Sequence, residues 1–512
     1  MNGTVLNCTS LFSQCDTTYL TGNQTITFSD FMSGVYYIDG NFKIDQGVTV
    51  YVKPFTSGGC GKLEIHADNI TIKGEINGDY AGFPGGIPGN GASLASSLTG
   101  HAAALTGCNS KDDAGVVSVE GGKAGAAGMG SGSGMAGTDG SAGSGPKQRC
   151  GNSNDTYGMI PGSGGAGGGG GASYGGTGTP GIAGGNGSGT HVGNNSTVSP
   201  EYAVLAGNGG TGGTTGAVYG TESGDDIEPG SGGAGAGGGG RSYDAGLAGA
   251  RGGNGGGLVI LEAVHELTIE GMISVNGENG SVGGHAGSGG ATEKCCSDGC
   301  DDCGEANMSA GAGGGSGAGA GSGGGIVLRS ETASISGTLN AAGGTGGNGG
   351  NAGVGITCNY GGNIFCSSGS ITTGNGQAGG KGGDGGGGRI KIFTGLCSPG
   401  QVNPVTSVLG GGNAAQGTYV HVCAASVGLE TVEELRFSIY PNPAGSFVTV
   451  DLLNVTGTEN KLVLTDTKGA VLLTETTTNT TVAWSLEGLN SGMYFLTIQS
   501  NGQTVATKII KQ

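Results

Sequence analysis

The sequence predicts an all-β protein with parallel β-solenoid rungs, glycine-rich polyglycine-II insertions and a C-terminal Ig-like β-sandwich. Three observations lead to this architecture. Glycine accounts for 126 of the 512 residues, far above the average share of about 7%. Short runs of β-branched and aromatic residues, separated by tight turns, recur in the same order along the chain. Near residue 430 the glycine content becomes ordinary and apolar residues alternate along clear strands.

The composition excludes several other classes of protein. Glycine does not recur strictly at every third position and only 12 residues are proline, which excludes collagen. The sequence lacks long helical stretches of Ala, Glu, Lys and Leu, which excludes a coiled coil. Long tracts carry no apolar side chains to bury, so the chain is no ordinary α/β enzyme throughout.

The net charge of −18, from 20 basic and 38 acidic residues, argues against nucleic acid and anionic membrane as partners. Binding to phosphate groups needs clusters of Lys and Arg. No apolar run is long enough for a membrane-spanning helix. The first residues lack the basic start and the apolar segment of a secretory signal peptide, so we expect the chain to begin at or near its mature start.

Residues 1–82 are predicted to form an N-terminal β-rich segment. Short strands, such as 48–52 and 70–72, alternate with turns that contain Gly, Asn and Asp, a pattern typical of a β-solenoid or a compact β-sandwich. The solenoid is favoured because residues 63–78 resemble segments farther along the chain. His66 and His265 occupy similar positions in two of these repeats, which predicts a packing or rim role for both.

Residues 83–425 are predicted to form a glycine-rich region that contains repeated β rungs. The rungs are expected at 258–277, 326–340 and 389–394, each after a run of glycines. A unit of two strands and a turn cannot bury its apolar face alone, so we expect the rungs to stack on one another. The alternative is a set of isolated hairpins in a disordered chain.

The tracts between the rungs have a local period of three, with two glycines followed by a polar residue. This period matches polyglycine-II-type extended helices, which have three residues per turn and no internal hydrogen bonds. Such helices can pack side by side because only glycine lets the backbones approach closely, and their third face would carry Thr, Asn, Asp or Lys to water. A flexible linker is the alternative. The composition and period resemble the polyglycine-II bundles of phage tail-tip adhesins and snow-flea type antifreeze proteins.

Residues 430–512 contain about seven short strands, the pattern of a small Ig-like β-sandwich. Their motifs resemble the C-terminal sorting domain of the type IX secretion system of Bacteroidota. The residues that carry the resemblance are Tyr440, Pro441, Asn442, Pro443, Gly492, Tyr494, Lys508 and Lys511. The resemblance implies the type IX machinery as a partner and a final location outside the cell or on the outer-membrane surface. In this family, export is commonly followed by removal of the domain, so the resemblance implies such removal here.

The 13 cysteines predict an oxidising compartment and disulfide bonds. Their number is odd, and Cys60 is predicted to be the unpaired thiol. Several others are close in sequence, including Cys8 with Cys15 and Cys397 with Cys423. The disulfide candidates are Cys8, Cys15, Cys108, Cys150, Cys295, Cys296, Cys300, Cys303, Cys358, Cys366, Cys397 and Cys423.

No cofactor is predicted, apart from weak candidates for calcium. The Cys-x-x-Cys spacing near residue 300 suits zinc, but disulfides are favoured in an exported protein. Carboxylates are the ligands that calcium prefers, and the candidates are Asp298, Asp301 and Asp302, or Asp225, Asp226 and Glu228. The six histidines are scattered and no catalytic constellation is visible, so we expect that the protein is not an enzyme.

These features predict a secreted or cell-surface structural or adhesive protein that presents glycine-rich lobes on a β-solenoid. Lone aromatic residues within glycine tracts are candidates for contact with a glycan or a protein surface, with local packing as the alternative. They are Tyr174, Tyr202, Tyr219, Tyr243 and Tyr360. One rival function is a self-assembling filament or sheath subunit. The other is a β-helix polysaccharide-active enzyme, which would need paired carboxylates on one rung face.

Overall fold

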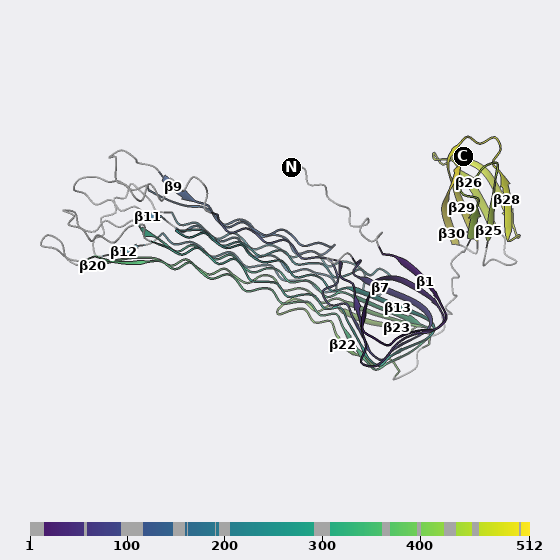
Figure 1. Ribbon diagram of the computed structural model, residues 1–512, viewed down its shortest axis with the longest axis horizontal. Helices are drawn as coiled ribbons and strands as arrows, with labels where there is room; N and C mark the ends of the chain where they lie inside the picture. The colour runs from purple at the N-terminus through teal and green to yellow at the C-terminus, as the bar shows by residue number, and fades with distance from the viewer. Residues whose placement is uncertain are drawn as a thin grey trace. The chain divides into compact units, whose positions relative to one another are not determined.

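The computed structural model is all-β in its described residues and divides into two compact units, 1–426 and 427–512 (Figure 1). We call them unit 1 and unit 2. The structure describes residues 15–55, 59–93, 116–146, 159–160, 162–189, 191–193, 205–290, 308–360, 369–396, 401–423, 437–452, 460–500 and 503–512. Within these residues the predicted all-β class is confirmed.

Unit 1 contains two large parallel sheets. Sheet A has ten strands in the order β1-β4-β7-β13-β16-β21-β23, with β2, β5 and β17 alongside. Its strands are β1 (Thr17–Thr21), β2 (Gln24–Ile26), β4 (Gly34–Asp39), β5 (Phe42–Ile44), β7 (Lys62–Ile72), β13 (Leu258–Ile269), β16 (Gly325–Ser330), β17 (Thr332–Ile335), β21 (Arg389–Thr394) and β23 (Thr418–Cys423).

Sheet B has six strands in the order β22-β18-β14-β8-β6-β3. These strands are β3 (Asp30–Met32), β6 (Thr49–Val52), β8 (Glu75–Asn77), β14 (Met272–Ser274), β18 (Thr338–Asn340) and β22 (Val405–Ser407). Each repeat of the chain therefore contributes strands first to sheet A and then to sheet B. The two sheets enclose one apolar cluster, because alternate side chains of every strand point into the same space.

The repeated islands of the sequence stack in register. Val259 pairs with Leu63 on one side and with Ile326 on the other, and Ile326 pairs in turn with Ile390. All four side chains are buried in the shared apolar cluster. The predicted stacking of the islands is confirmed, and the alternative of isolated hairpins is wrong.

Side chains that pair from strand to strand form columns that run through the stack. Two of the buried columns end in a polar residue at both ends. In sheet B, Asp30 pairs with Val50 at one end of the column, and Thr406 pairs with Leu339 at the other end. In sheet A, Thr18 pairs with Tyr36 at one end, and His421 pairs with Ile392 at the other. Polar terminal repeats of this kind prevent further apolar stacking and keep repeat proteins soluble.

The glycine-rich segments lie side by side and extend from the sheets (Figure 1). Their backbones are joined by hydrogen bonds that rotate through three directions, as segment 162–174 shows. Its N–H groups donate to 182–188 from Gly162, Gly165 and Gly168, to 135–141 from Gly164, Gly167 and Gly170, and to 238–241 from Ser163 and Ala166. The predicted period of three is thus the period of these hydrogen bonds, and the described tracts are not flexible linkers.

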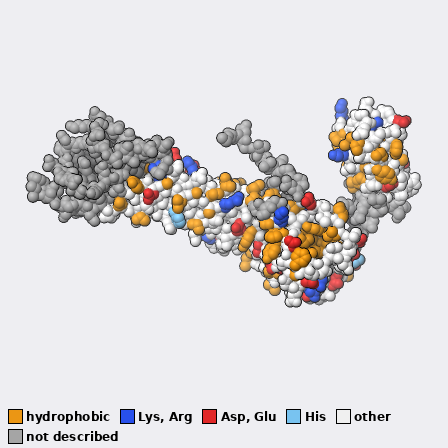
Figure 2. All heavy atoms as spheres, viewed as in Figure 1, with side chains coloured by type: hydrophobic (Ala, Val, Ile, Leu, Met, Phe, Trp, Pro, Cys, Tyr) orange, Lys and Arg blue, Asp and Glu red, His pale blue; other side chains and the backbone are white. Residues whose placement is uncertain are grey.

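Glycine is required in these segments because neighbouring backbones are in direct contact. A Cβ atom at Gly319 would overlap the carbonyl group of Gly170, and one at Gly315 would overlap that of Gly237. A minority of fully buried positions hold the small side chains of alanine or serine, such as Ala234 and Ser316. Figure 2 shows hydrophobic side chains gathered over the sheets and scattered along the glycine-rich segments.

The polar side chains at every third position of the glycine-rich segments accept hydrogen bonds from neighbouring backbones. Asn279 Oδ1 accepts a hydrogen bond from the N–H of Thr345 at 2.8 Å, and His285 Nδ1 accepts one from the N–H of Asn351 at 2.9 Å. Asn254 Oδ1 does the same for Gly85 at 3.0 Å. An outer segment has no neighbouring backbone on one side, so a short polar side chain supplies the acceptor instead. These side chains therefore also complete the hydrogen bonding of the bundle, in addition to the predicted exposure to water.

Short strand pairs accompany the glycine-rich segments. They are β9 (Val116–Val119), β10 (Gly143–Pro146), β11 (Met159–Ile160), β12 (His191–Gly193), β15 (Met308–Ser309), β19 (Thr357–Tyr360) and β20 (Gly369–Thr373). Most of them pair antiparallel, in contrast to the parallel sheets A and B.

Unit 2 consists of two antiparallel sheets around one apolar cluster. The three-stranded sheet has the order β24-β25-β28 and the four-stranded sheet the order β27-β26-β29-β30. The strands are β24 (Phe437–Tyr440), β25 (Phe447–Leu452), β26 (Asn460–Thr465), β27 (Val471–Thr477), β28 (Thr481–Ser485), β29 (Gly492–Ser500) and β30 (Gln503–Lys511). Trp484 and Leu496 are among the buried side chains between them.

We predict that Gly319→Ala destabilises unit 1, because the new methyl group overlaps the backbone of Gly170. Overpacking a close-packed interior costs about 1–3 kcal/mol or more. Thermal unfolding followed by circular dichroism measures the effect. Asn348→Ala, at an exposed position of a similar segment, is the matched control and should change stability by less than about 0.5 kcal/mol. Equal melting temperatures for the two variants would contradict the close-contact account.

Candidate functional site

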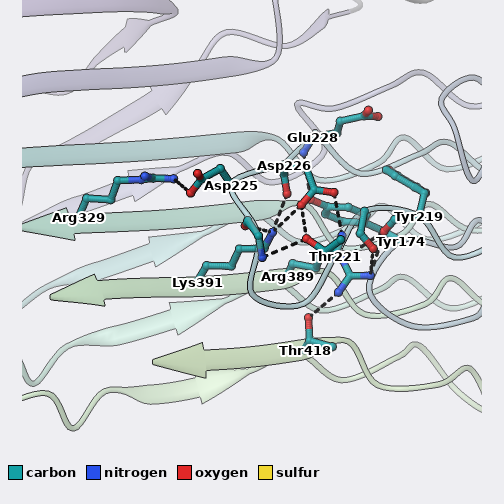
Figure 3. Close-up of polar contacts among 12 residues, drawn as sticks. Tyr174, Tyr219, Thr221, Asp225, Asp226, Glu228, Arg329, Arg389, Lys391 and Thr418 are labelled. Atoms are coloured by element: carbon teal, nitrogen blue, oxygen red, sulfur yellow. Dashed lines mark hydrogen bonds and ion pairs between the residues drawn. The ribbon is translucent and has the colours of Figure 1, made fainter. Parts of the chain in front are cut away.

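A strap, residues 217–229, crosses the outer face of sheet A and is held there by two buried cations (Figure 3). The Lys391 ammonium, which is 0% exposed, donates to the carbonyl oxygens of Gly224 at 2.7 Å and Asp226 at 2.6 Å. The Arg389 guanidinium donates to the carbonyl oxygens of Tyr219 and Gly220 at 2.9 and 3.0 Å. Alternation along β21 directs both cations away from the apolar core, and the strap covers them.

One predicted contact tyrosine, Tyr174, packs beneath this strap, and a second, Tyr219, belongs to the strap itself. Tyr174 is 1% exposed and its ring stacks on that of Tyr219 with centroids 4.6 Å apart. The Tyr174 hydroxyl accepts a hydrogen bond from the N–H of Glu228 at 3.0 Å, and the Tyr219 hydroxyl donates to the carbonyl of Pro229 at 2.9 Å. Burial raises the pKa of both hydroxyls. A surface contact is therefore wrong for Tyr174, and local packing describes both rings.

The remaining candidate tyrosines have different outcomes. Tyr243 is exposed, and its contact role stays a prediction. Tyr202 lies outside the described residues, and so does the side chain of Tyr360.

Two of the three calcium candidates in the strap, Asp225 and Asp226, already have cationic partners, and the third, Glu228, accepts a hydrogen bond from the Ser131 hydroxyl at 3.0 Å. Arg329 Nη2 lies 2.8 Å from Asp225 Oδ1, and Lys391 Nζ lies 3.4 Å from Asp226 Oδ1. Hydrogen bonds from Thr221, with a further contribution from Lys391, lower the pKa of Asp226. Across the described ranges, no group of His, Cys, Asp and Glu side chains is arranged to hold a metal ion. The other calcium candidates, Asp298, Asp301 and Asp302, lie outside those ranges.

The cysteine predictions need one correction. Cys60 is not unpaired, because it forms a disulfide with Cys15 across 45 residues of sequence. Stacking of the first repeats brings their Cα atoms to 5.5 Å, a distance that sequence spacing could not reveal. Cys423 is also disulfide-bonded. The candidates outside the described residues are Cys8, Cys108, Cys150, Cys295, Cys296, Cys300, Cys303, Cys366, Cys397 and the side chain of Cys358.

A continuous column of side chains runs along the outer face of sheet A. We call it the outer column, and its residues pair strand by strand: Tyr19, Tyr37, His66, Glu262, Arg329, Phe393 and Val422. The first three rings are stacked, with centroids 5.3 and 4.4 Å apart. The next members form ion pairs, and the Arg329 guanidinium lies 4.8 Å from the centre of the Phe393 ring.

The centre of the outer column holds a charged cluster. His66 Nε2 lies 2.8 Å from Glu64 and His66 Nδ1 lies 3.0 Å from Glu262. Burial favours the neutral imidazole, but hydrogen bonds to Glu262 and Glu64 outweigh it and raise the pKa of His66 to about 9. Burial also opposes ionisation of Glu64, yet hydrogen bonds from His66 and Lys62 lower its pKa to about 2.

His265 does not occupy the position that its sequence spacing predicts. The partner of His66 is Glu262, three residues before His265, and the register of β13 shifts farther along, between Ala263 and Glu266. His265 lies in this irregularity, with an exposed side chain 3.8 Å from Glu331. A packing or rim role was predicted for both histidines: packing describes His66, which stacks on Tyr37, and does not describe the exposed His265.

Four residues that form these contacts were not predicted from the sequence: Glu262, Arg329, Arg389 and Lys391. A signal was present for the last two, because Arg389 and Lys391 alternate with buried isoleucines and must therefore point to one face of a strand. Their partners in the strap are 165 or more residues away in sequence. No local pattern identifies a partner at that separation.

In unit 2 the predicted sorting residues come together at one edge of the sandwich. The Asn442 side chain donates to the carbonyl of Lys508 at 3.0 Å and accepts from the N–H of Ile510 at 2.9 Å. Gly492 pairs with Lys511 across β29 and β30. The Tyr440 hydroxyl lies 2.5 Å from Asp451 Oδ2, and the buried Tyr494 donates to the carbonyl of Asn490 at 2.7 Å. The two hydrogen bonds of Asn442 fix the start of the domain against its last strand.

Comparison with known proteins bears on unit 2. Residues 438–512 match the family described as "Secretion system C-terminal sorting domain". The match confirms the predicted sorting tail, which implies export by the type IX secretion system to the cell surface or the extracellular space. No curated protein matches the chain. No comparison supports the resemblance to polyglycine-II bundle proteins.

Two solved structures show limited similarity. One is PorZ, a surface component of the type IX secretion system of Porphyromonas gingivalis, with 23% identity over 15% of this chain and a TM-score of 0.14. The match spans 11% of PorZ. The other is a DUF3244 family protein with an immunoglobulin-like β-sandwich from Bacteroides vulgatus, with 13% identity, 16% of this chain, 88% of that chain and a TM-score of 0.14. Among the described residues, no helix is long and apolar enough to cross a membrane.

We predict that the stability of unit 1 depends on pH through Glu64 and His66. The Glu64 contribution is present above pH 4.5 and is lost as the pH falls through about 2. The His66 contribution is complete below pH 6.5 and is lost as the pH rises through about 9. Both contributions therefore coincide between about pH 4.5 and 6.5.

Melting temperatures measured from pH 3 to 10 check this window. His66→Gln should remove the contribution of the imidazolium and so flatten the decline on the alkaline side, and it should also weaken the acid-side decline because it removes a hydrogen-bond partner of Glu64. Glu64→Gln should abolish its own acid-side contribution and reduce the alkaline one, because it removes a partner of His66. An unchanged alkaline decline in His66→Gln would refute the role of the imidazolium.

Proposed function

We propose that this protein is a structural or adhesive cell-surface protein, exported by the type IX system, in which a closed β-solenoid supports a polyglycine-II bundle. The main support for this proposal is the hydrogen bonding, in three directions, between glycine-rich segments that are far apart in sequence. Such bonding gives order to tracts that have almost no side chains to bury. The segments continue directly from the sheets, so the sheets act as their base.

The outer surface of the bundle suits a role in presentation. Every third residue of an outer segment points outward, and these positions hold different side chains, including Thr345, Asn348, Asn351 and Val354. A rigid backbone with changeable outer positions can tolerate sequence variation at the surface without loss of order. Loops on rigid scaffolds are the usual sites of recognition.

A filament or sheath subunit is less well supported. End-to-end assembly would extend the apolar columns from one molecule into the next. Two of these columns instead end in polar residues, one in Asp30 and Thr406 in sheet B and the other in Thr18 and His421 in sheet A. Burying these groups in an interface without partners would be costly.

An enzyme is also less well supported, although the outer column does bring two carboxylates together. Glu64 and Glu262 both contact His66. A general acid needs a pKa near the working pH, whereas the pKa of Glu64 is lowered to about 2. Glu262 is shared between His66 and Arg329, so both carboxylates serve as ion-pair partners within the sheet.

Export can be tested by expressing the full chain and a chain lacking residues 438–512 in a Bacteroidota host. We expect the full chain on the surface or in the medium and the shortened chain inside the cell, because the deletion removes the sorting tail but not unit 1. Immunoblots of cell fractions and medium measure the distribution. A host without a working type IX system is the control and should retain both chains. Equal release of both chains would contradict the proposal.

The structural role has a separate test. Electron microscopy of the purified full chain should show discrete particles, and incubation with polysaccharides should release no reducing ends. Regular filaments would favour the sheath subunit, and release of reducing ends would favour the enzyme.

A further inference from the structure

The outer face of sheet B carries an unusual row of side chains. Its residues pair strand by strand from one end of the sheet to the other: Phe31, Tyr51, Asn77, Ser274, Asn340 and Ser407. We call this set the sheet B row. Neighbouring strands in a sheet are about 4.8 Å apart, so the row is a straight line of two aromatic rings followed by amide and hydroxyl groups.

The aromatic end of the row is accessible. Phe31 is 62% exposed and Tyr51 is 40% exposed, and their ring centroids lie 5.4 Å apart. Neither ring contributes to the apolar cluster between the sheets, which is filled from the opposite side of the same strands by Val50 and Val52. A core-packing role therefore does not account for the two rings, and aromatic side chains of this kind are typical of binding surfaces.

The polar end of the row is held in position from the side. Asp79 Oδ1 accepts hydrogen bonds from the Ser274 hydroxyl at 2.5 Å and from the N–H of Asn276 at 2.7 Å. These bonds fix the loop that contains Tyr80, which is exposed and has a left-handed φ of 61°. A left-handed conformation is unfavourable for a tyrosine and persists only where the surrounding structure imposes it.

The charge of this face identifies the kind of ligand. The column beside the sheet B row holds Thr49, Glu75, Met272, Thr338 and Val405. The two columns therefore contain no cation, and the carboxylates at this face are Glu75 and the neighbouring Asp79. The chain as a whole carries a net charge of −18. A face of aromatic rings, amides and hydroxyls with carboxylates and no cation disfavours an anionic ligand and matches one with apolar C–H faces, many hydroxyl groups and no charge.

We propose that the outer face of sheet B binds a neutral polysaccharide. The rings of Phe31 and Tyr51 stack on sugar faces, and Asn340 exchanges hydrogen bonds with sugar hydroxyl groups. Asn77 already donates to Glu75 at 2.9 Å and accepts from the N–H of Asp79 at 3.1 Å, so it helps to position this face. The linear row suits an extended chain. This inference rests on the proposed adhesive function and assigns its ligand to unit 1.

The test uses the purified full chain in affinity gel electrophoresis with four neutral polysaccharides, laminarin, mannan, xyloglucan and amylopectin, and with anionic hyaluronate. We expect retardation by at least one neutral polysaccharide and none by hyaluronate. Phe31→Ala combined with Tyr51→Ala should weaken binding at least about tenfold, because both stacking surfaces are lost. Asn340→Ala should weaken it less, and it provides a second variant with little effect on folding.

Tyr19→Ala removes an exposed aromatic ring on sheet A, away from the sheet B row, and should leave binding unchanged. Circular dichroism verifies that each variant is folded. Retardation by none of the four neutral polysaccharides, retardation by hyaluronate alone, or equal binding by the double variant would overturn the proposal. The export test is independent, since a chain that reaches the surface but binds no polysaccharide contradicts this inference and leaves export intact.

Discussion

Hydrogen bonding between glycine backbones is the constraint on which most of unit 1 depends. The glycine-rich segments have few side chains to bury, and glycine loses more conformational freedom on folding than any other residue. Their order therefore requires that nearly every buried N–H and C=O group has a partner. The rotation of donors through three directions in segment 162–174 meets this requirement with neighbours on several sides.

The parallel sheets and the glycine-rich segments depend on each other. Successive sheet strands such as β7 and β13 are adjacent in space but separated by a long glycine-rich excursion in the sequence. The apolar columns set the register at the base, and the hydrogen bonds continue that register beyond the sheets. Polar side chains complete the arrangement, since Asn279 and His285 provide acceptors at the surface and Lys391 anchors the strap.

Periodic features of this protein could be predicted from the sequence, and long-range polar contacts could not. The alternation in 63–78 and its recurrence predicted the stacked strands, and the period of three predicted the hydrogen-bonding period. The pairing of Cys60 and the burial of Tyr174 depend on which segments become neighbours. The position of His265 depends on a shift of register in β13 that composition does not reveal.

Hydrogen–deuterium exchange of the purified full chain, read by mass spectrometry, tests the central claim most directly. The relevant peptides come from 229–243 and 308–325, which lie inside the bundle and consist largely of glycine, alanine and serine. The account predicts that their amides exchange as slowly as those of β13 and β16. Exchange of these peptides at the rate of an unstructured chain, with β13 and β16 still protected, would contradict it.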